Sequence, residues 1–102
     1  MKEYYEIEVA GLKRQLPICP LNENLQIGAF VIFGDVELTV KSAEELLKLA
    51  PDDYDYMITA ESKGIPLIHE MARQSSKNKY ILARKSTKLY MKGVVRCEVN
   101  SI

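Results

Sequence analysis

The residues best suited to chemistry form one short turn made of Glu61, Ser62, Lys63 and Gly64. The turn precedes an apolar helical pattern with Pro66 in its first turn, and a helix start carries unpaired N–H groups and a partial positive charge. Lys63 adds a full charge, and Gly64 lets the backbone approach a ligand closely. These features predict a site for a phosphate-like anion. On these four residues alone, a plain turn with an exposed lysine explains the pattern equally well.

A second concentration of charge follows in the last quarter of the chain. From Lys77 to Arg96 there are seven Lys or Arg residues and no Asp or Glu. The whole chain has a net charge of zero, which argues against general binding to nucleic acid or to a membrane surface. The basic block must therefore meet small anions, water or a partner. Within it, residues 85–93 show neither helical nor strand periodicity, so we expect a mobile loop.

The elements around the turn indicate a β-α-β unit. Residues 54–60 are aromatic and β-branched, which predicts a strand after the turn at Pro51. A helix is expected to run to about Gln74, and residues 80–83 form a second apolar run of strand length. Parallel strands joined by one helix put the turn after the first strand at the carboxyl edge of the sheet, where open α/β folds bind ligands.

The first half of the chain predicts a hairpin and a helix. Residues 3–18 alternate around Ala10-Gly11, and Pro17 and Pro20 are expected to end the second strand. Residues 26–33 are continuously apolar between glycines, which favours an extended segment.

The pattern over residues 36–50 predicts the clearest helix. Asp35 could cap its start, but Ser42 and Glu45 form a capping-box pattern that would delay the regular helix to Ala43. A final strand is expected at residues 94–99.

Length and composition indicate one domain in the cytoplasm. The 102 residues contain no apolar run long enough to span a membrane, and the charged start lacks a secretory leader. Cys19 and Cys97 are expected to be free thiols, since they are far apart in the sequence and no export signal accompanies them. His69, the only histidine, is expected to pack or to face solvent rather than to catalyse.

Three segments, which follow one another along the chain in the family's order, resemble the first half of a type I phosphoribosyltransferase, closest to the adenine branch. Residues 56–64 are similar to the strand and Glu-Ser-Arg-Gly turn that binds the pyrophosphate of phosphoribosyl pyrophosphate, with Lys63 where arginine is usual. Residues 81–88 are similar to the Arg-Lys-x-x-Lys opening of the flexible loop that closes over the substrates. Residues 31–35 are similar to the Val-Phe-Arg-Asp segment that holds the purine, with Gly34 replacing the arginine.

The resemblance implies roles for ten residues. The pyrophosphate would be bound by Glu61, Ser62, Lys63 and Gly64. The flexible loop would contribute Arg84, Lys85 and Lys88. The purine would be held by Ile32, Phe33 and Gly34, with Phe33 stacking on the base.

The resemblance also implies the fold and the reaction. The fold would be α/β, a partial type I phosphoribosyltransferase fold with an N-terminal β-hairpin, a helix, a parallel β-α-β unit, a flexible loop and a strand. Residues 1–34 would form the hairpin and purine side, and residues 35–102 the core. The activity would be that of a glycosyltransferase of purine salvage, which moves phosphoribose to an adenine-like base with Mg²⁺ accompanying the phosphoribosyl pyrophosphate.

One part of the family pattern is missing from these residues. The strand with two acidic residues and the Thr-Gly-Gly-Thr-like loop that cradles the ribose 5-phosphate do not occur. We therefore expect a truncated domain that is inactive alone, with no catalytic residue and no protein metal ligand assigned. The alternative is a non-catalytic anion- or nucleotide-binding or regulatory module derived from the family. The open edge of a parallel sheet leads us to expect a homodimer.

Overall fold

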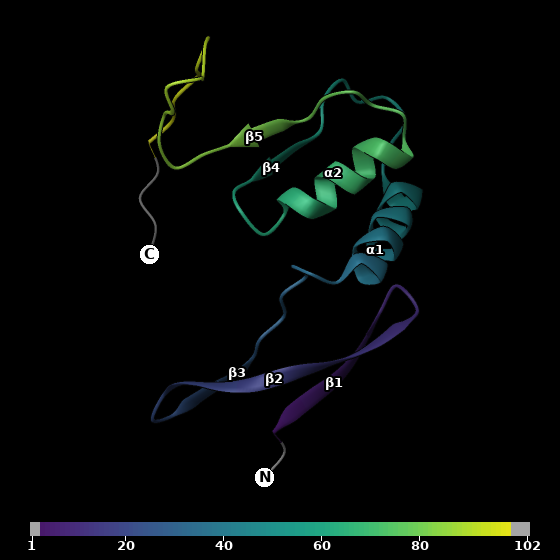
Figure 1. Ribbon diagram of the computed structural model, residues 1–102, viewed down its shortest axis with the longest axis vertical. Helices are drawn as coiled ribbons and strands as arrows, with labels where there is room; N and C mark the ends of the chain where they lie inside the picture. Colours follow the sequence, from purple (N-terminus) through teal and green to yellow (C-terminus); the bar gives the residue numbers. More distant parts are fainter. Residues whose placement is uncertain (1–2, 99–102) are drawn as a thin grey trace.

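The computed structural model describes residues 3–98 and is a mixed α/β structure. The antiparallel sheet has the order β1-β2-β3, and the parallel sheet pairs β4 with β5. Figure 1 shows the antiparallel sheet as one layer at the bottom of the view, with both helices and the β4–β5 pair above it. The elements are β1 (Tyr4–Val9), β2 (Leu12–Asn22), β3 (Leu25–Gly28), α1 (Val36–Leu49), β4 (Ile58–Ala60), α2 (Ile65–Gln74) and β5 (Ile81–Ala83).

The hairpin of β1 and β2 is confirmed, but the expectation that prolines end β2 is wrong. β2 continues through Pro17 and Pro20 to Asn22. Its first half pairs with β1 as far as Pro17, and the half from Ile18 onward pairs with β3. A register shift follows Pro20. Each half of β2 pairs mainly with one neighbouring strand, as a strand at the edge of a sheet does. The absence of an N–H group at Pro17 and Pro20 therefore removes few hydrogen bonds between strands.

Of the segment expected to be extended, residues 26–28 form the end of β3, and residues 29–33 contain neither helix nor strand before a sharp turn. The amide of Asp35 donates to the carbonyl of Ile32 at 3.1 Å. Gly34 has a φ of +84°, in the left-handed region that favours glycine. This turn leads directly into α1.

Helix α1 begins at Val36, so the delayed start at Ala43 is wrong. The Asp35 carboxylate accepts a hydrogen bond from the amide of Leu38 at 3.0 Å, which caps the helix. The same carboxylate accepts from Nε of Arg14 on β2 at 2.7 Å, and a second ion pair joins Arg14 to Glu37 at 2.9 Å. Ser42 lies inside the helix, and its buried hydroxyl has no hydrogen-bond partner among the described residues. Asp35 thus fixes both the helix start and its attachment to the sheet.

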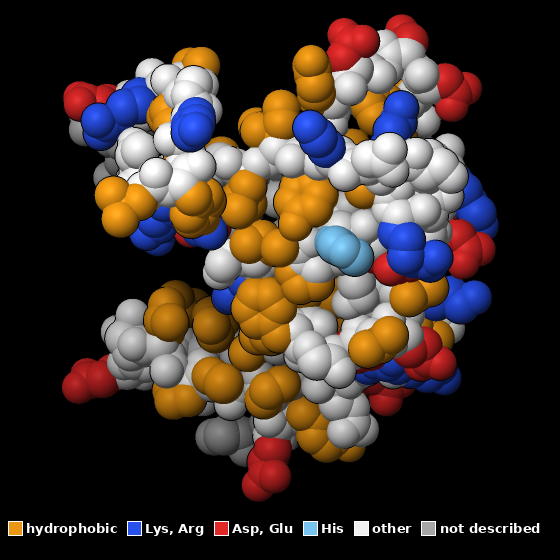
Figure 2. Space-filling view, turned by 45° about the horizontal axis from the view of Figure 1, so that its top comes forward, with side chains coloured by type: hydrophobic (Ala, Val, Ile, Leu, Met, Phe, Trp, Pro, Cys, Tyr) orange, Lys and Arg blue, Asp and Glu red, His pale blue; other side chains and the backbone are white. Residues whose placement is uncertain are grey.

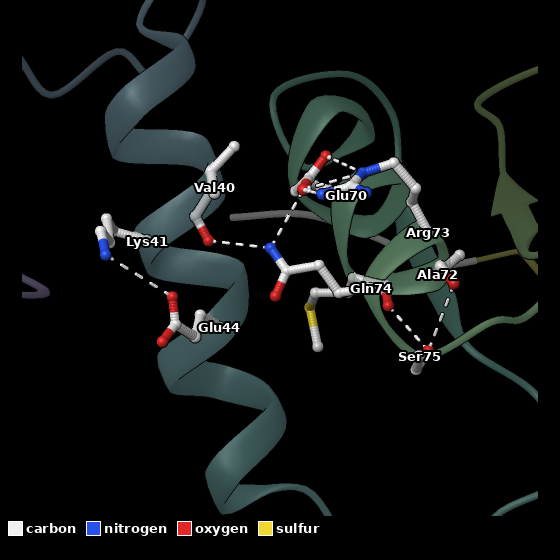
Figure 3. Close-up of polar contacts among 9 residues, drawn as sticks. Val40, Lys41, Glu44, Glu70, Ala72, Arg73, Gln74 and Ser75 are labelled. Atoms are coloured by element: carbon white, nitrogen blue, oxygen red, sulfur yellow. Dashed lines mark hydrogen bonds and ion pairs between the residues drawn. The ribbon is translucent and has the colours of Figure 1, made fainter.

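The main core lies between α1 and α2. Its buried apolar side chains come from both helices and are Leu38, Ala43, Ile68 and Ala72. Beside this core, Nε2 of Gln74 donates to the carbonyl of Val40 and to the Glu70 carboxylate, each at 3.0 Å (Figure 3). Arg73 and then Gln74 lower the pKa of Glu70 from 4.5 to about 2. A polar contact therefore supports the small apolar interface. Within residues 3–98, neither helix is long and apolar enough to cross a membrane.

The β-α-β unit is confirmed with shorter strands. Of the expected strand over residues 54–60, only Ile58–Ala60 forms β4, and β5 begins one residue later than expected, at Ile81. The register pairs Ile58 with Ile81 and Ala60 with Ala83, in parallel. Residues 84–98 contain no helix or strand. The strand expected over residues 94–99 is therefore wrong for residues 94–98, and Val99 lies outside the described residues.

A start of α1 at Val36 and a start at Ala43 predict opposite effects of mutations at Asp35 and Ser42. Asp35→Ala should destabilise the fold, because it removes the cap and the two hydrogen bonds that the carboxylate accepts from Nε and Nη2 of Arg14. Ser42→Ala should leave the stability unchanged or raise it by up to about 1 kcal/mol, since alanine favours helix and removes a buried hydroxyl without a partner. Urea unfolding followed by circular dichroism measures both. A larger loss for Ser42→Ala than for Asp35→Ala would contradict this helix start.

The Glu70 contact predicts a specific dependence of stability on pH. Because the folded pKa of about 2 lies below the ordinary 4.5, the stabilisation is fully present above pH 4.5 and is lost as pH falls toward 2. Glu70→Gln should therefore reduce the difference between the urea midpoints measured near neutral pH and at about pH 3. The matched variant Glu45→Gln removes an exposed carboxylate paired with Lys48 and should change that difference less. Equal effects would contradict the assignment.

Candidate anion site

The parallel pairing of β4 with β5 brings the turn that carries Lys63 next to the distant basic segment that begins at Arg84. Both strands end at the same edge of the sheet, so the turn after β4 lies beside the segment that follows β5 (Figure 1). The amide of Glu61 donates to the carbonyl of Ala83 at 3.0 Å and extends the ladder by one step. The Glu61 carboxylate then accepts from Nη1 of Arg84 at 2.8 Å and from the amide of Lys85. The predicted turn and the start of the predicted loop therefore form one structure.

The Glu61 carboxylate binds two groups of the segment that follows β5. The Lys85 amide, the Arg84 guanidinium and the charge of Lys88 lower the pKa of its carboxyl group. The carboxylate is consequently ionised at neutral pH and already engaged on both sides. Since it would repel a nearby phosphate, we assign Glu61 to positioning Arg84 and Lys85.

The turn itself presents backbone donors. Ile65 donates to the carbonyl of Ser62 at 3.2 Å, and Ile68 donates to that of Gly64 at 2.9 Å. The amides of Ser62, Lys63 and Gly64 have no hydrogen-bond partner in the described part of the chain. Lys63 is exposed and has no ion-pair partner within residues 3–98. Donors and a cation at the start of a helix suit an anion.

Gly64 packs closely against β4. It is the N-cap of α2, in a helical conformation, with Pro66 in the first turn. A Cβ at Gly64 would collide with Oγ1 of Thr59 on β4. Thr59 was not among the residues selected from the sequence, and no local pattern could reveal it, because the collision depends on how α2 folds back on β4.

The segment after β5 folds back near Arg84. The amide of Met91 donates to the carbonyl of Lys88 at 3.0 Å, which makes a local turn. Glu61 first, and Tyr90 after it, raise the pKa of Arg84, so the Tyr90 hydroxyl lies near that guanidinium. In Figure 2 this segment forms the upper left lobe and carries several blue side chains. The mobility expected for residues 85–93 stays a prediction.

The predicted purine residues lie on a different segment. Ile32 is buried, whereas the side chain of Phe33 is 48% exposed and therefore available for stacking. Gly34 forms the turn before α1. Within residues 3–98, no hydrogen bond or ion pair joins these three residues to the turn after β4. The Arg14–Asp35 pair, which sequence analysis missed because its partners are distant in the chain, fixes the end of this segment.

An apolar hollow of about 370 Å³ adjoins the turn. Thr59 and Gly64 line its near end, so the hollow and the anion site share a border. Figure 2 shows hydrophobic side chains gathered over the middle of the visible face. The remaining lining residues come from β4, from α2 and from the segment between α1 and β4: Ala50, Pro51, Tyr54, Tyr56, Met57, Ile58, Leu67, Ile68 and Met71.

Residues that could ligate a metal or react do not gather at this site. The described residues hold no group of three His, Cys, Asp or Glu side chains placed to bind a metal ion. Cys19 and Cys97 are free thiols, as expected, and His69 is exposed on α2. The arrangement can therefore bind and orient an anion through amides, lysines and Arg84.

Comparison with known proteins adds no assignment: no protein-family model matches this chain, and a search of curated proteins gives no match. The fold class stated above, mixed α/β, therefore follows from the structure itself.

The role of Glu61 predicts the behaviour of Glu61→Gln. The variant keeps the side-chain shape but loses the charge that holds Arg84 and the Lys85 amide. Hydrogen exchange at the Lys85 amide should become about tenfold faster, because its acceptor is weaker. Glu45→Gln, the matched exposed carboxylate on α1, should leave that exchange rate unchanged. If Glu61→Gln also leaves it unchanged, Glu61 does not position this segment.

Proposed function

We propose that this chain binds phosphoribosyl pyrophosphate as part of a purine phosphoribosyltransferase of nucleotide salvage, which moves phosphoribose to an adenine-like base. One observation carries the proposal: the turn 61–64 and the basic segment from Arg84 meet at the carboxyl edge of the β4–β5 pair. In open α/β folds this edge is where ligands bind. The three ordered resemblances in the sequence indicate which ligand to test.

The residues of the turn suit a pyrophosphate leaving group. Free amides at residues 62–64 and the charge of Lys63 would stabilise negative charge as it develops on the departing pyrophosphate. Arg84 and Lys85, held by Glu61, would face the same group from the second strand. Lys88 would approach with the loop and help to keep water from the reactive sugar carbon.

The purine side is supported by a smaller set of contacts. Phe33 presents a half-exposed ring on a segment that Asp35 fixes to α1 and Arg14 fixes to β2. An aromatic ring held in this way can stack on a base. The backbone of Ile32 and Gly34 would read the edge of the base.

The described residues do not form a magnesium cage. Mg²⁺ prefers several oxygen ligands and usually keeps its waters while binding to substrate phosphates. The carboxylate nearest the turn, Glu61, is occupied by Arg84 and Lys85. Any Mg²⁺ would therefore be held by the pyrophosphate oxygens and water.

Binding and turnover separate the proposal from its alternative, a non-catalytic anion- or nucleotide-binding module. The family's strand with two acidic residues and its Thr-Gly-Gly-Thr-like loop do not occur in these 102 residues, so we propose that the chain binds phosphoribosyl pyrophosphate but does not turn it over alone. A coupled assay with adenine, phosphoribosyl pyrophosphate and magnesium measures turnover, and calorimetry measures binding of each substrate. Binding of phosphoribosyl pyrophosphate without any binding of a purine would favour the alternative.

Lys63→Ala should weaken the binding of pyrophosphate about five- to tenfold, because it removes one charge-assisted contact that solvent partly screens. Gly64→Val should weaken binding further, since its side chain would displace the turn from Thr59. Isothermal titration calorimetry with pyrophosphate measures both affinities. Lys13→Ala, which removes an exposed lysine from β2, is the control and should bind as the unaltered chain does. Unchanged affinity in both turn variants would refute the anion site.

A further inference from the structure

The outer edge of β4 is open in the described structure. The carbonyl of Met57 accepts from Ile81, and the amide of Glu61 donates to Ala83, so alternate residues of this strand face β5. The backbone groups of Ile58 and Ala60 consequently face the other way. Their amides have no partner within residues 3–98, and the Ala60 carbonyl accepts only a long bond from its neighbour Thr59 at 3.3 Å. An open edge of this kind is a template for another strand.

Apolar surface surrounds this edge. Tyr56 is 76% exposed and Ile58 is 63% exposed, and the hollow of about 370 Å³ lies between β4 and α2. α2 packs on the Thr59 side of β4, whereas Ile58 and its register partner Ile81 lie on the uncovered face. A strand added at this edge would place alternate side chains over the hollow.

The chain exposes more surface than a compact domain of its size. Its solvent-accessible area is 8783 Å², whereas a compact protein of the same mass exposes about 5,800 Å². Its radius of gyration is 16.8 Å, compared with about 13 Å for a compact chain of this length. A typical interface removes about 800 Å² from each partner, so the excess is more than one interface requires.

The charged residues near each outer strand indicate which edge can pair with a second copy of the chain. Lys79, Arg84 and Lys85 flank β5, so two β5 strands paired antiparallel would bring like charges together. The outer strand β1 carries Glu6 and Glu8, which repel a second copy in the same way.

At β4, charges of both signs flank the strand. Asp55 precedes it, whereas Glu61, whose charge Arg84 already compensates, and Lys63 follow it. Antiparallel pairing of two copies would bring Asp55 of each copy toward Lys63 of the other. The β4 edge therefore suits a second copy of this chain.

We propose that two copies of this chain associate by antiparallel pairing of their β4 outer edges, with Ile58 of each copy opposite Ala60 of the other. A two-fold axis relates the copies, because the same edge serves as both surfaces. The two β4–β5 pairs then form one continuous four-stranded sheet. This inference does not depend on the proposed ligand.

Ile58→Lys tests the interface. Sedimentation equilibrium at micromolar concentrations should give the unaltered chain twice its mass of 11.6 kDa. Ile58→Lys should raise the dimer dissociation constant by about tenfold or more, because a lysine on an edge strand opposes pairing. The matched variant Ile81→Lys makes the same change on the same face of β5 and should leave the constant within about twofold. Circular dichroism identifies any variant that fails to fold.

Ala60→Pro provides a second variant if Ile58→Lys does not fold. Proline removes the Ala60 amide, which faces the partner, and leaves the ladder to β5 intact. It should also dissociate the dimer. A monomer at all concentrations, equal effects of Ile58→Lys and Ile81→Lys, or a dimer that survives both folded β4 variants would overturn the proposal. The last outcome would place the interface at another surface, such as β3.

Discussion

The pairing of two three-residue strands determines how the rest of the site is arranged. β4 and β5 meet in parallel, with Ile58 opposite Ile81 and Ala60 opposite Ala83. This register places Glu61 directly beside Arg84 and Lys85, which are more than twenty positions away in the sequence. A shift by one residue would move alternate side chains to the other face and separate these charges. The short β4–β5 ladder therefore fixes the positions of both the turn 61–64 and the basic segment that begins at Arg84.

The charges at the carboxyl edge of the β4–β5 pair explain why Glu61, Arg84 and Lys63 have different roles. Glu61 compensates the cations of the second segment, and its pKa is lowered as a result. Arg84 is held in place at 2.8 Å from Glu61, while Lys63 has no ion-pair partner among the described residues. One carboxylate thus orders part of the cationic surface and leaves the remainder free to meet an anion.

Local patterns in the sequence predicted much of this arrangement, whereas distant contacts were not predictable. The proline and apolar spacing of α2, and the alternation of β1, are local signals, and both elements formed as expected. The end expected for β2 at its prolines was wrong because the hydrogen bonds that a proline costs depend on which strands lie on each side. The helix start expected at Ala43 was wrong because the capping pattern of Ser42 competes with the cap by Asp35. Arg14, a residue on another element, reinforces the Asp35 cap. Likewise, nothing in the sequence near Gly64 indicates its collision with Thr59.

The central claim is that the turn 61–64 and the segment beginning at Arg84 form one anion site. Nuclear magnetic resonance of the ¹⁵N-labelled chain during titration with pyrophosphate tests it most directly. We expect the amide resonances of Ser62, Lys63 and Gly64 to shift together with that of Lys85, with one common dissociation constant, while the amide resonances of β1 stay unchanged. Shifts confined to the lysine-rich segment, or different constants for the two segments, would contradict the claim.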